Sequence, residues 1–210
     1  MSLELPQLYP LTDGALSGLS HVEQVERLMD GGATLIQLRE KDLPPLEFYR
    51  QAKSALRVAR QRGVRIIIND RVDLALALQA DGVHLGQEDL PPEAARRLLG
   101  ENAIIGLSTH NADQARQAVT FPVNYVAIGP VFSTATKRDT AREVGLEGVR
   151  SVRSAVGAMP LVAIGGITAA NARQVIDAGA DAVALISALL TRPEETIIRT
   201  RLLFQTLATN

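Results

Sequence analysis

The stretch that decides the fold is IIINDRVDLALALQADGVHLGQED, residues 66–89. Its β-branched opening is typical of a buried strand, its spacing becomes helical after Asn69-Asp70, and a second strand runs from Gly82 to Leu85. Parallel strands end at the same edge of a sheet, so Asp70 and Asp89, which follow the two strands, are expected to converge. Two carboxylates at one edge predict a site for a hard metal ion.

The composition predicts one globular domain spanning residues 1–210. With 46% hydrophobic residues, the chain can bury one core but is short for two ordinary domains. Its 22 basic and 23 acidic residues nearly balance, which argues against a nucleic-acid partner or an anionic membrane surface. The sequence has no cysteine, no basic leader and no long apolar run, so we expect a soluble cytoplasmic protein.

Strand and helix patterns alternate along the chain and predict an α/β fold, a (β/α)8 TIM barrel. The expected strands are residues 8–12, 34–38, 64–68, 82–85, 103–106, 124–128, 160–164 and 182–186. The segments between them carry one apolar face at helical spacing, as in Phe48, Ala52, Ala55, Leu56 and Ala59. Eight repeated units in 210 residues fit a barrel better than a doubly wound sheet, which needs fewer strands.

Polar residues gather where the expected strands end, which is the face on which barrels hold their active sites. In strand order they are Thr12 and Asp13; Gln37, Arg39, Glu40 and Lys41; Asn69 and Asp70; Gln87, Glu88 and Asp89; Ser108, Thr109 and His110; Thr134, Thr136 and Lys137; Gly165 and Gly166; and Ser187. Arg39, Lys41 and Lys137 can bind phosphate oxygens, and Asp70 and Asp89 can hold Mg2+ together with substrate phosphates. This combination predicts a diphosphate substrate.

Two further segments belong to the expected site. The turn Gly165-Gly166-Ile167-Thr168 and the pair Ile186-Ser187 follow the seventh and eighth strands, where barrels often bind a phosphate through backbone N–H groups. Residues 129–145 form the one long connection without clear periodicity, and this predicts a mobile lid.

Each of these features also has a purely structural interpretation. Four residues precede expected helices, and each taken singly is best interpreted as a helix N-cap: Asp70, Asp89, Asn111 and Thr168. The charges at 39–41 alone would form a solvated loop, and Gly165-Gly166 alone a tight turn. His110 is expected to orient a neighbour or cap a helix and is assigned no chemistry. The functional interpretation rests on polar groups following strand after strand, because random surface charge would populate both ends of a barrel.

At these residues the chain resembles the thiamine-phosphate synthase family over nearly its whole length. The matching segments are Leu8-Tyr9 with Leu11-Thr12-Asp13, IQLREK at 36–41, IINDRVDLAL at 67–76, ADGVHLGQEDLP at 80–91, IIGLSTH at 104–110, YVAIGPVF at 125–132 leading to Lys137, and VAIGGI at 162–167. The resemblance implies a (β/α)8 enzyme that joins 4-amino-2-methyl-5-hydroxymethylpyrimidine diphosphate to 4-methyl-5-(2-phosphoethyl)thiazole. The products would be thiamine phosphate and diphosphate.

The resemblance also implies a role for each matched residue. The pyrimidine diphosphate would contact Gln37, Arg39, Lys41, Asn69, Ser108 and Lys137, the cofactor Mg2+ would bind Asp70 and Asp89, and the thiazole phosphate would contact Thr134, Ala135, Thr136, Gly166, Ile186 and Ser187. The implied reaction is dissociative, so that a pyrimidine cation forms while Arg39, Lys41 and Lys137 stabilise the leaving diphosphate. The partners would be these two small molecules, and a homo-oligomer stays open. Ser133, where many relatives have proline, and Pro10 depart from the family pattern without removing a functional group, although Ser133 could loosen the lid.

Three alternatives stay open at this point. A thiazole tautomerase would share the barrel, but it has no diphosphate to neutralise, so Asp89 and Lys137 favour the synthase. A Schiff-base aldolase would use Lys137, yet that lysine lies in a polar segment rather than on a desolvated strand. A phosphate-binding sensor without catalysis would leave the carboxylate pair and Arg39 unexplained.

Overall fold

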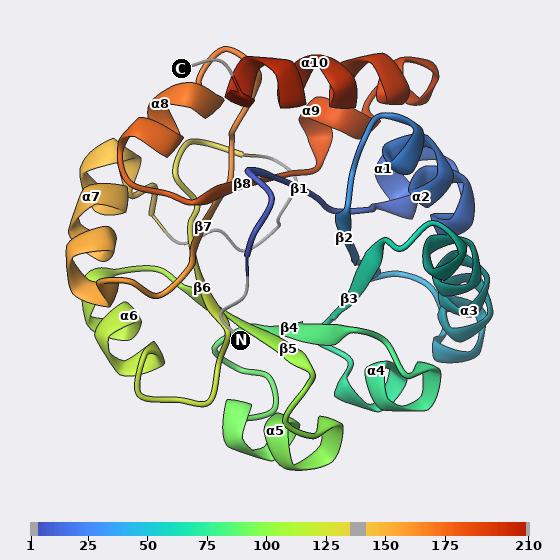
Figure 1. Cartoon of the computed structure of the whole chain (residues 1–210), viewed down its shortest axis with the longest axis horizontal. Helices are drawn as coiled ribbons and strands as arrows, with labels where there is room; N and C mark the ends of the chain where they lie inside the picture. The colour runs from blue at the N-terminus through green and yellow to red at the C-terminus, as the bar shows by residue number, and fades with distance from the viewer. Residues whose placement is uncertain (1–3, 135–141, 209–210) are drawn as a thin grey trace.

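The computed structural model describes residues 4–134 and 142–208, and its eight strands form one parallel sheet that curves into a barrel (Figure 1). The strands are β1 Leu8–Pro10, β2 Leu35–Leu38, β3 Arg65–Asn69, β4 Gly82–Leu85, β5 Ile104–Thr109, β6 Tyr125–Ile128, β7 Leu161–Ile164 and β8 Ala182–Leu185. Their order in the sheet is β1-β8-β7-β6-β5-β4-β3-β2. The predicted (β/α)8 barrel is therefore confirmed, with each strand within a few residues of its expected place.

The barrel closes between β1 and β2 through a single bridge rather than a ladder. Leu11 pairs with Gln37, and the Thr12 N–H donates to the Gln37 carbonyl at 2.9 Å. The Leu11 N–H still donates to Leu185 on β8, at 2.9 Å. The chain thus passes from the β8 side to the β2 side at this point, which is why β1 ends at Pro10 instead of running to residue 12 as expected.

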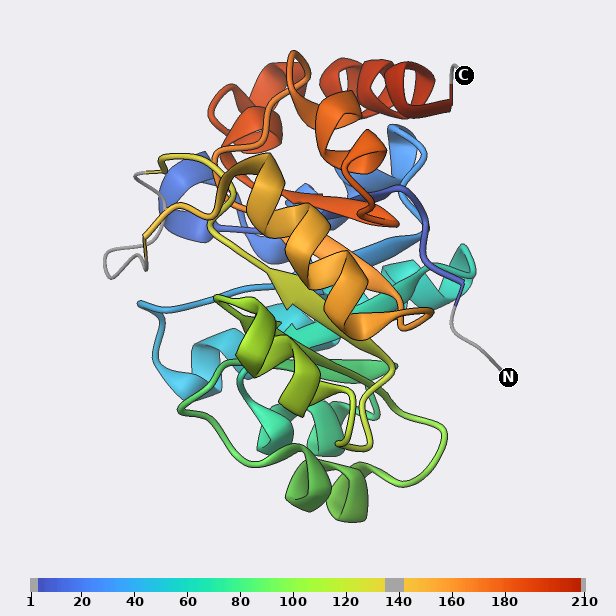
Figure 2. The same cartoon turned by 90° about the vertical axis from the view of Figure 1, so that its left-hand side faces the viewer.

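Helices surround the sheet as an outer ring (Figures 1 and 2). They are α1 Gly14–Ser17, α2 His21–Asp30, α3 Pro45–Gln61, α4 Val72–Leu78, α5 Pro92–Leu99, α6 Ala112–Ala118, α7 Gly145–Val156, α8 Ala172–Asp177, α9 Ser187–Leu190, the short 3-10 helix η1 Pro193–Glu195, and α10 Thr196–Ala208. The predicted apolar face of α3 is its buried face. Ser20 and Glu23 form a capping box at the start of α2, and proline opens α3 and α5.

Alternate residues of each strand enter two separate cores. In β6, Tyr125 and Ala127 point into the barrel, whereas Val126 and Ile128 pack against the helices. This period of two follows from strand geometry, which sends successive side chains to opposite faces. The inner core is small and contains two large side chains, Tyr9 and Tyr125. It fills the barrel below the carboxyl ends of the strands.

The two ends of the predicted lid lie side by side. The N–H of Val144 donates to the Pro130 carbonyl, and that of Gly145 donates to the Val131 carbonyl, both at 2.9 Å. These bonds place the segment next to the carboxyl ends of β6 and β7, since Val131 also donates to Ile164 at 3.0 Å. Residues 135–141, the centre of the predicted lid, lie outside the described residues, so lid motion stays a prediction.

None of the helices in the described ranges is long and apolar enough to cross a membrane.

Candidate active site

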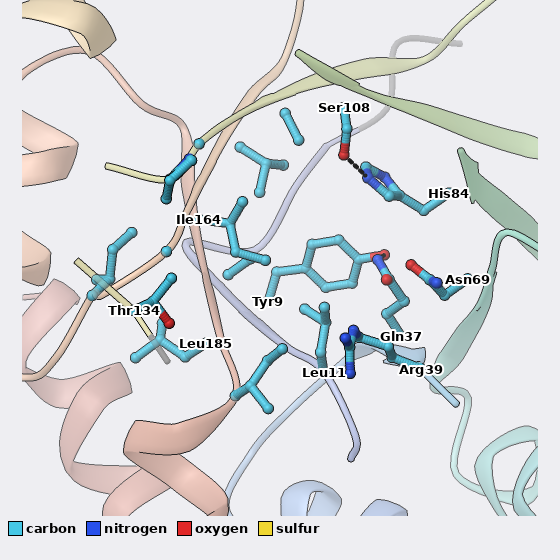
Figure 3. Close-up of a pocket in the computed structure, with 18 of the residues that line it drawn as sticks. Tyr9, Leu11, Gln37, Arg39, Asn69, His84, Ser108, Thr134, Ile164 and Leu185 are labelled. Carbon is cyan, nitrogen blue, oxygen red and sulfur yellow. Dashed lines mark hydrogen bonds between the residues drawn. The ribbon is translucent and has the colours of Figure 1, made fainter. Parts of the chain in front are cut away.

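A cavity opens at the carboxyl ends of the strands, and most of the expected site residues line it (Figure 3). Those that line it are Gln37, Arg39, Lys41, Asn69, Asp70, Ser108, Thr134, Gly166, Ile186 and Ser187. Asp89 lies at its edge, where its carboxylate accepts the N–H of the lining residue Gly86 at 2.7 Å. Ala135, Thr136 and Lys137 lie outside the described residues.

The alternation of the strands explains how these side chains meet. Inward positions recur every second residue, so the inner core residue Leu35 on β2 is followed by Gln37 and Arg39, which line the cavity. Likewise Ile67 on β3 is followed by Asn69. The cavity is therefore a continuation of the barrel interior, lined by the strand residues just beyond its packed core.

The two basic residues of the β2 end are both paired with carboxylates. Arg39 Nη1 lies 2.7 Å from Asp13 Oδ2, and both side chains are mostly buried. Lys41 Nζ forms a hydrogen-bonded ion pair with Asp70 Oδ2. The sequence predicted cations at this position but not their carboxylate partners, which come from the ends of β1 and β3. The pairs hold both cations at the rim of the cavity.

The carboxylates of Asp70 and Asp89 lie close together. The pKa of Asp89 is raised, first by burial and then by the negative charge of Asp70, and the Gly86 N–H and Lys41 oppose this rise. In the described ranges no group of three or more His, Asp or Glu side chains could hold a metal ion. A carboxylate pair facing an open cavity nevertheless fits Mg2+, which keeps several waters and takes one or two carboxylates plus substrate phosphates.

The alternative interpretation of four residues as helix N-caps is correct only for Asn111. The Asn111 side chain accepts the N–H of Gln114 at the start of α6. Arg71 occupies the N-cap position of α4, because the backbone of Asp70 turns left-handed with φ of 61°. Proline 91 holds that position for α5 in place of Asp89. Asn171 replaces Thr168 at α8, and its side chain accepts the Thr168 N–H at 2.7 Å.

A chain of buried hydrogen bonds crosses the cavity floor. Gln37 Nε2 donates to the Tyr9 hydroxyl at 3.1 Å, and that hydroxyl lies 3.1 Å from the Tyr125 hydroxyl. The Tyr125 hydroxyl lies 2.9 Å from His84 Nδ1, and His84 Nε2 lies 2.8 Å from Ser108 Oγ (Figure 3). Burial raises the pKa of Tyr9 to about 12 and that of Tyr125 well above its usual value, so both stay neutral.

One acceptor in this row of hydrogen bonds has no partner, and it belongs to Gln37, which lines the cavity. Gln37 Oε1 is the single buried side-chain polar atom without a hydrogen-bond partner in the part of the chain that the structure describes. A buried unpaired acceptor costs about 1–3 kcal/mol, so a ligand that donates a hydrogen bond there would recover stability. Gln37 and Ser108 therefore form two polar ends of an otherwise aromatic floor, which suits a flat heteroaromatic ligand.

The opposite wall of the cavity is a glycine turn followed by the start of a helix. Gly165 and Gly166 have φ of 103° and 64°, and a Cβ on Gly166 would lie 2.5 Å from the Ser133 carbonyl oxygen. The turn therefore requires glycine both for its conformation and for its approach to the segment after β6. Helix α9 begins at Ser187 without a side-chain cap among the described residues. Ile186 and Ser187, at the start of this helix, line the cavity.

Comparisons with known proteins agree with this geometry. A family model described as thiamine monophosphate synthase matches residues 8–189. The chain belongs to that family. A thiamine-phosphate synthase of Chloroflexus aurantiacus is 46% identical over 191 residues, covering 90% of this chain and 88% of the relative. One of Moorella thermoacetica is 47% identical over 173 residues, covering 82% of each chain.

Solved structures support the same assignment. The thiamine phosphate pyrophosphorylase of Pyrococcus furiosus superposes with a TM-score of 0.87 at 39% identity, covering 96% of this chain and 95% of that one. A KDPGal structure at 19% identity, with a TM-score of 0.70, shares the fold alone. The thiamine-phosphate synthases of this family are transferases, so the expectation of an enzyme is confirmed.

Several residues that line the cavity of this family member were not predicted from the sequence. Tyr9, His84 and Tyr125 form its floor, and His110, to which no chemistry was assigned, also lines it with Nδ1 2.7 Å from the Gly129 carbonyl oxygen. Their positions along the strands could have identified them from the sequence. Each lies on a strand or just after it, at the inward parity shared by the residues that were predicted, as with His84 two residues after Gly82 on β4.

Proposed function

We propose that this chain is a thiamine-phosphate synthase. It would join 4-amino-2-methyl-5-hydroxymethylpyrimidine diphosphate to 4-methyl-5-(2-phosphoethyl)thiazole, giving thiamine phosphate and diphosphate. The observation that carries the proposal is the composition of one cavity. Arg39, Lys41 and the carboxylates of Asp70 and Asp89 lie at one wall, an aromatic floor lies between, and the turn at Gly166 and the start of α9 lie at the other.

The pyrimidine diphosphate fits the side of β2 to β5. The ring would lie over the floor between Gln37 and Ser108, with Asn69 beside it, and the diphosphate would lie at Arg39 and Lys41. Asp70 and Asp89 would hold Mg2+, which when bound would neutralise diphosphate charge. Lys137, outside the described residues, would add a third cation from the segment whose ends lie beside β6 and β7.

The thiazole phosphate fits the opposite wall. Backbone N–H groups of the turn at Gly166 and of Ile186-Ser187 would bind its phosphate, together with Thr134 to Thr136. This arrangement would place the thiazole nitrogen against the carbon that loses diphosphate. The C–O bond would break first, and the nitrogen would then capture the pyrimidine cation. The protein would supply no nucleophile, and its contribution would be positioning, charge stabilisation and exclusion of water.

The test is product formation from the two proposed substrates, first with Mg2+ and then with EDTA. Wild type should make thiamine phosphate only with the metal, and Asp89→Ala should lower the rate roughly 10^2-fold or more. Asp113→Ala is the matched control, because Asp113 is an exposed carboxylate on α6 that does not line the cavity, and it should keep wild-type activity. Folded wild type that forms no product under any metal condition would refute the synthase and leave the tautomerase as the better candidate.

A further inference from the structure

A buried set of three side chains lies behind the loop that carries Arg39 and Lys41. Thr12 follows β1, His21 is the first residue of α2, and Glu40 belongs to residues 39–44, which join β2 to α3. None of the three is among the described residues that line the cavity. The His21 and Glu40 side chains are only 1% and 6% exposed. We refer to Thr12, His21 and Glu40 as the loop clamp.

The hydrogen bonds of His21 fix its protonated nitrogen. His21 Nε2 lies 3.0 Å from Glu40 Oε2, and a carboxylate only accepts, so Nε2 carries the hydrogen. His21 Nδ1 lies 2.7 Å from the Thr12 hydroxyl oxygen. Burial lowers the pKa of His21, so the ring is neutral and Nδ1 accepts the hydrogen of that hydroxyl. The histidine thus links the two other members of the clamp.

The clamp ends on the backbone of the loop at both sides of Glu40. The Thr12 hydroxyl oxygen accepts the N–H of Arg39 at 3.2 Å. Glu40 Oε1 accepts three successive N–H groups, from Lys41 at 2.8 Å, Asp42 at 2.7 Å and Leu43 at 3.1 Å. Four of the backbone donors of this loop are therefore held by two side chains, and His21 holds those side chains in turn.

These hydrogen bonds indicate that His21 orients the loop of residues 39–44 and does not only stabilise the fold. The ring of His21 lies 5.2 Å from that of Phe48, and this packing does not require the two ring nitrogens, which instead contact Thr12 and Glu40. What it supplies is orientation of a loop whose two basic side chains reach Asp13 and Asp70 at the cavity. We propose that the loop clamp positions Arg39 and Lys41 for a diphosphate group. The inference rests on the proposed function in its choice of ligand.

The test compares the binding of inorganic diphosphate in the presence of Mg2+, measured by calorimetry, between wild type and His21→Phe. Phenylalanine keeps an aromatic ring, slightly larger than imidazole, beside Phe48 but removes both hydrogen bonds. The Kd for diphosphate and the KM for the pyrimidine substrate should rise roughly tenfold, the usual effect of losing a residue that orients a ligand-binding group. His21→Gln, which keeps an N–H donor in place of Nε2, should recover most of the affinity.

The matched control is Val25→Ala. Val25 lies one turn further along α2, is equally buried, and has no polar group to offer the loop. It should lower the melting temperature through lost packing but leave the Kd unchanged. Hydrogen exchange of residues 39–43 should speed up in His21→Phe and not in Val25→Ala. If His21→Phe fails to fold, Glu40→Gln is the substitute, and its Kd should rise because the amide replaces one acceptor by a donor.

The possible outcomes separate this inference from the proposed function. A folded His21→Phe variant with wild-type Kd and KM would overturn the clamp even if the enzyme is active. Wild type that binds diphosphate but makes no thiamine phosphate would refute the synthase, and the comparison of Kd values would still decide the clamp. Wild type that does not bind diphosphate with Mg2+ would overturn both.

Discussion

Asp70 shows how a single backbone angle decides between two roles. With φ of 61° it adopts a left-handed conformation, which costs a residue other than glycine roughly 1 kcal/mol. Its N–H donates to the His84 carbonyl at 2.8 Å, so the residue continues the edge of the sheet by one bond. The turn moves Asp70 away from the N-cap of α4 and brings its side chain to Lys41. The strained residue is one of the two proposed to hold Mg2+.

Lys137 is the residue whose proposed role depends most on the sequence alone, since it lies outside the described residues. Lys137→Ala should lower the turnover number roughly 10^2-fold or more, because it removes one preorganised cation from the leaving diphosphate. Lys53→Ala, at an exposed position of α3, should have no effect. Steady-state kinetics with saturating substrates would check this, and near-normal turnover of Lys137→Ala would exclude the lysine as a leaving-group stabiliser.

The buried position of His21 leads to a prediction for how the free energy of unfolding depends on pH, and this prediction does not depend on catalysis. Its ordinary pKa is 6.5, burial lowers the pKa in the folded state, and the charged groups facing it, Glu40 and Asp13, only partly oppose this. The unfolded chain therefore gains a proton below pH 6.5 that the folded chain does not. Stability is fully present above pH 6.5 and is lost as the pH falls towards the lower folded-state pKa, by at most about 1.4 kcal/mol per pH unit.

Denaturant unfolding between pH 5 and 7.5 would measure this loss. His21→Phe cannot bind the proton, so its stability should fall less steeply over the same range. Parallel curves for the two proteins would show that His21 does not contribute to the pH dependence.

At the scale of the elements, the parity of each strand decides what faces the cavity. Residues that alternate with the outer core, such as Gly82 and His84 on β4 or Gly106 and Ser108 on β5, point into the barrel. The inward-facing residues earlier in each strand, such as Gly82 and Gly106, lie in the barrel interior. Those nearer the carboxyl end, such as His84 and Ser108, line the cavity. The two layers are joined by Tyr125, whose ring packs inside while its hydroxyl belongs to the cavity floor.

Gly106 is a position where this packing leaves no space for a side chain. A Cβ at Gly106 would lie 2.1 Å from Cζ of Tyr125, so Gly106→Ala must displace the ring. We expect the free energy of unfolding to fall by about 1–3 kcal/mol, the usual cost of overpacking, and denaturant unfolding would measure it. In the double variant with Tyr125→Leu, the loss should be smaller than the sum of the two single losses. Additive losses would mean that the two residues do not compete for this space.

The whole molecule concentrates its functional groups at one end of a closed ring. The last helix, α10, packs against α2, and the Arg27 side chain of α2 donates to the Pro193 carbonyl at 2.6 Å. The second helix and the last helix are therefore neighbours in the ring (Figure 1). Residues from every strand line the cavity at the strand ends, so a ligand bound there should stabilise the barrel as a unit.

This leads to a prediction for thermal unfolding. The Mg2+–diphosphate complex, present at about 100 times its Kd, should stabilise the protein by about 2.7 kcal/mol, which is roughly 5–10 °C in Tm for a chain of this size. EDTA should reverse the shift, and Asp89→Ala should show little of it. An equal shift with and without metal would separate diphosphate binding from the carboxylate pair.

The sequence by itself determined the barrel, the order of its strands and the end at which polar residues gather, because these follow from local periodicity and from where each strand stops. It did not determine which groups meet. The pairing of Arg39 with Asp13, the buried line from Gln37 to Ser108 and the clamp at His21 join residues from different strands and helices. Only the closure of the ring brings them within hydrogen-bonding distance, and the inward parity of the strands and the left-handed turn at Asp70 then fix which atoms face each other.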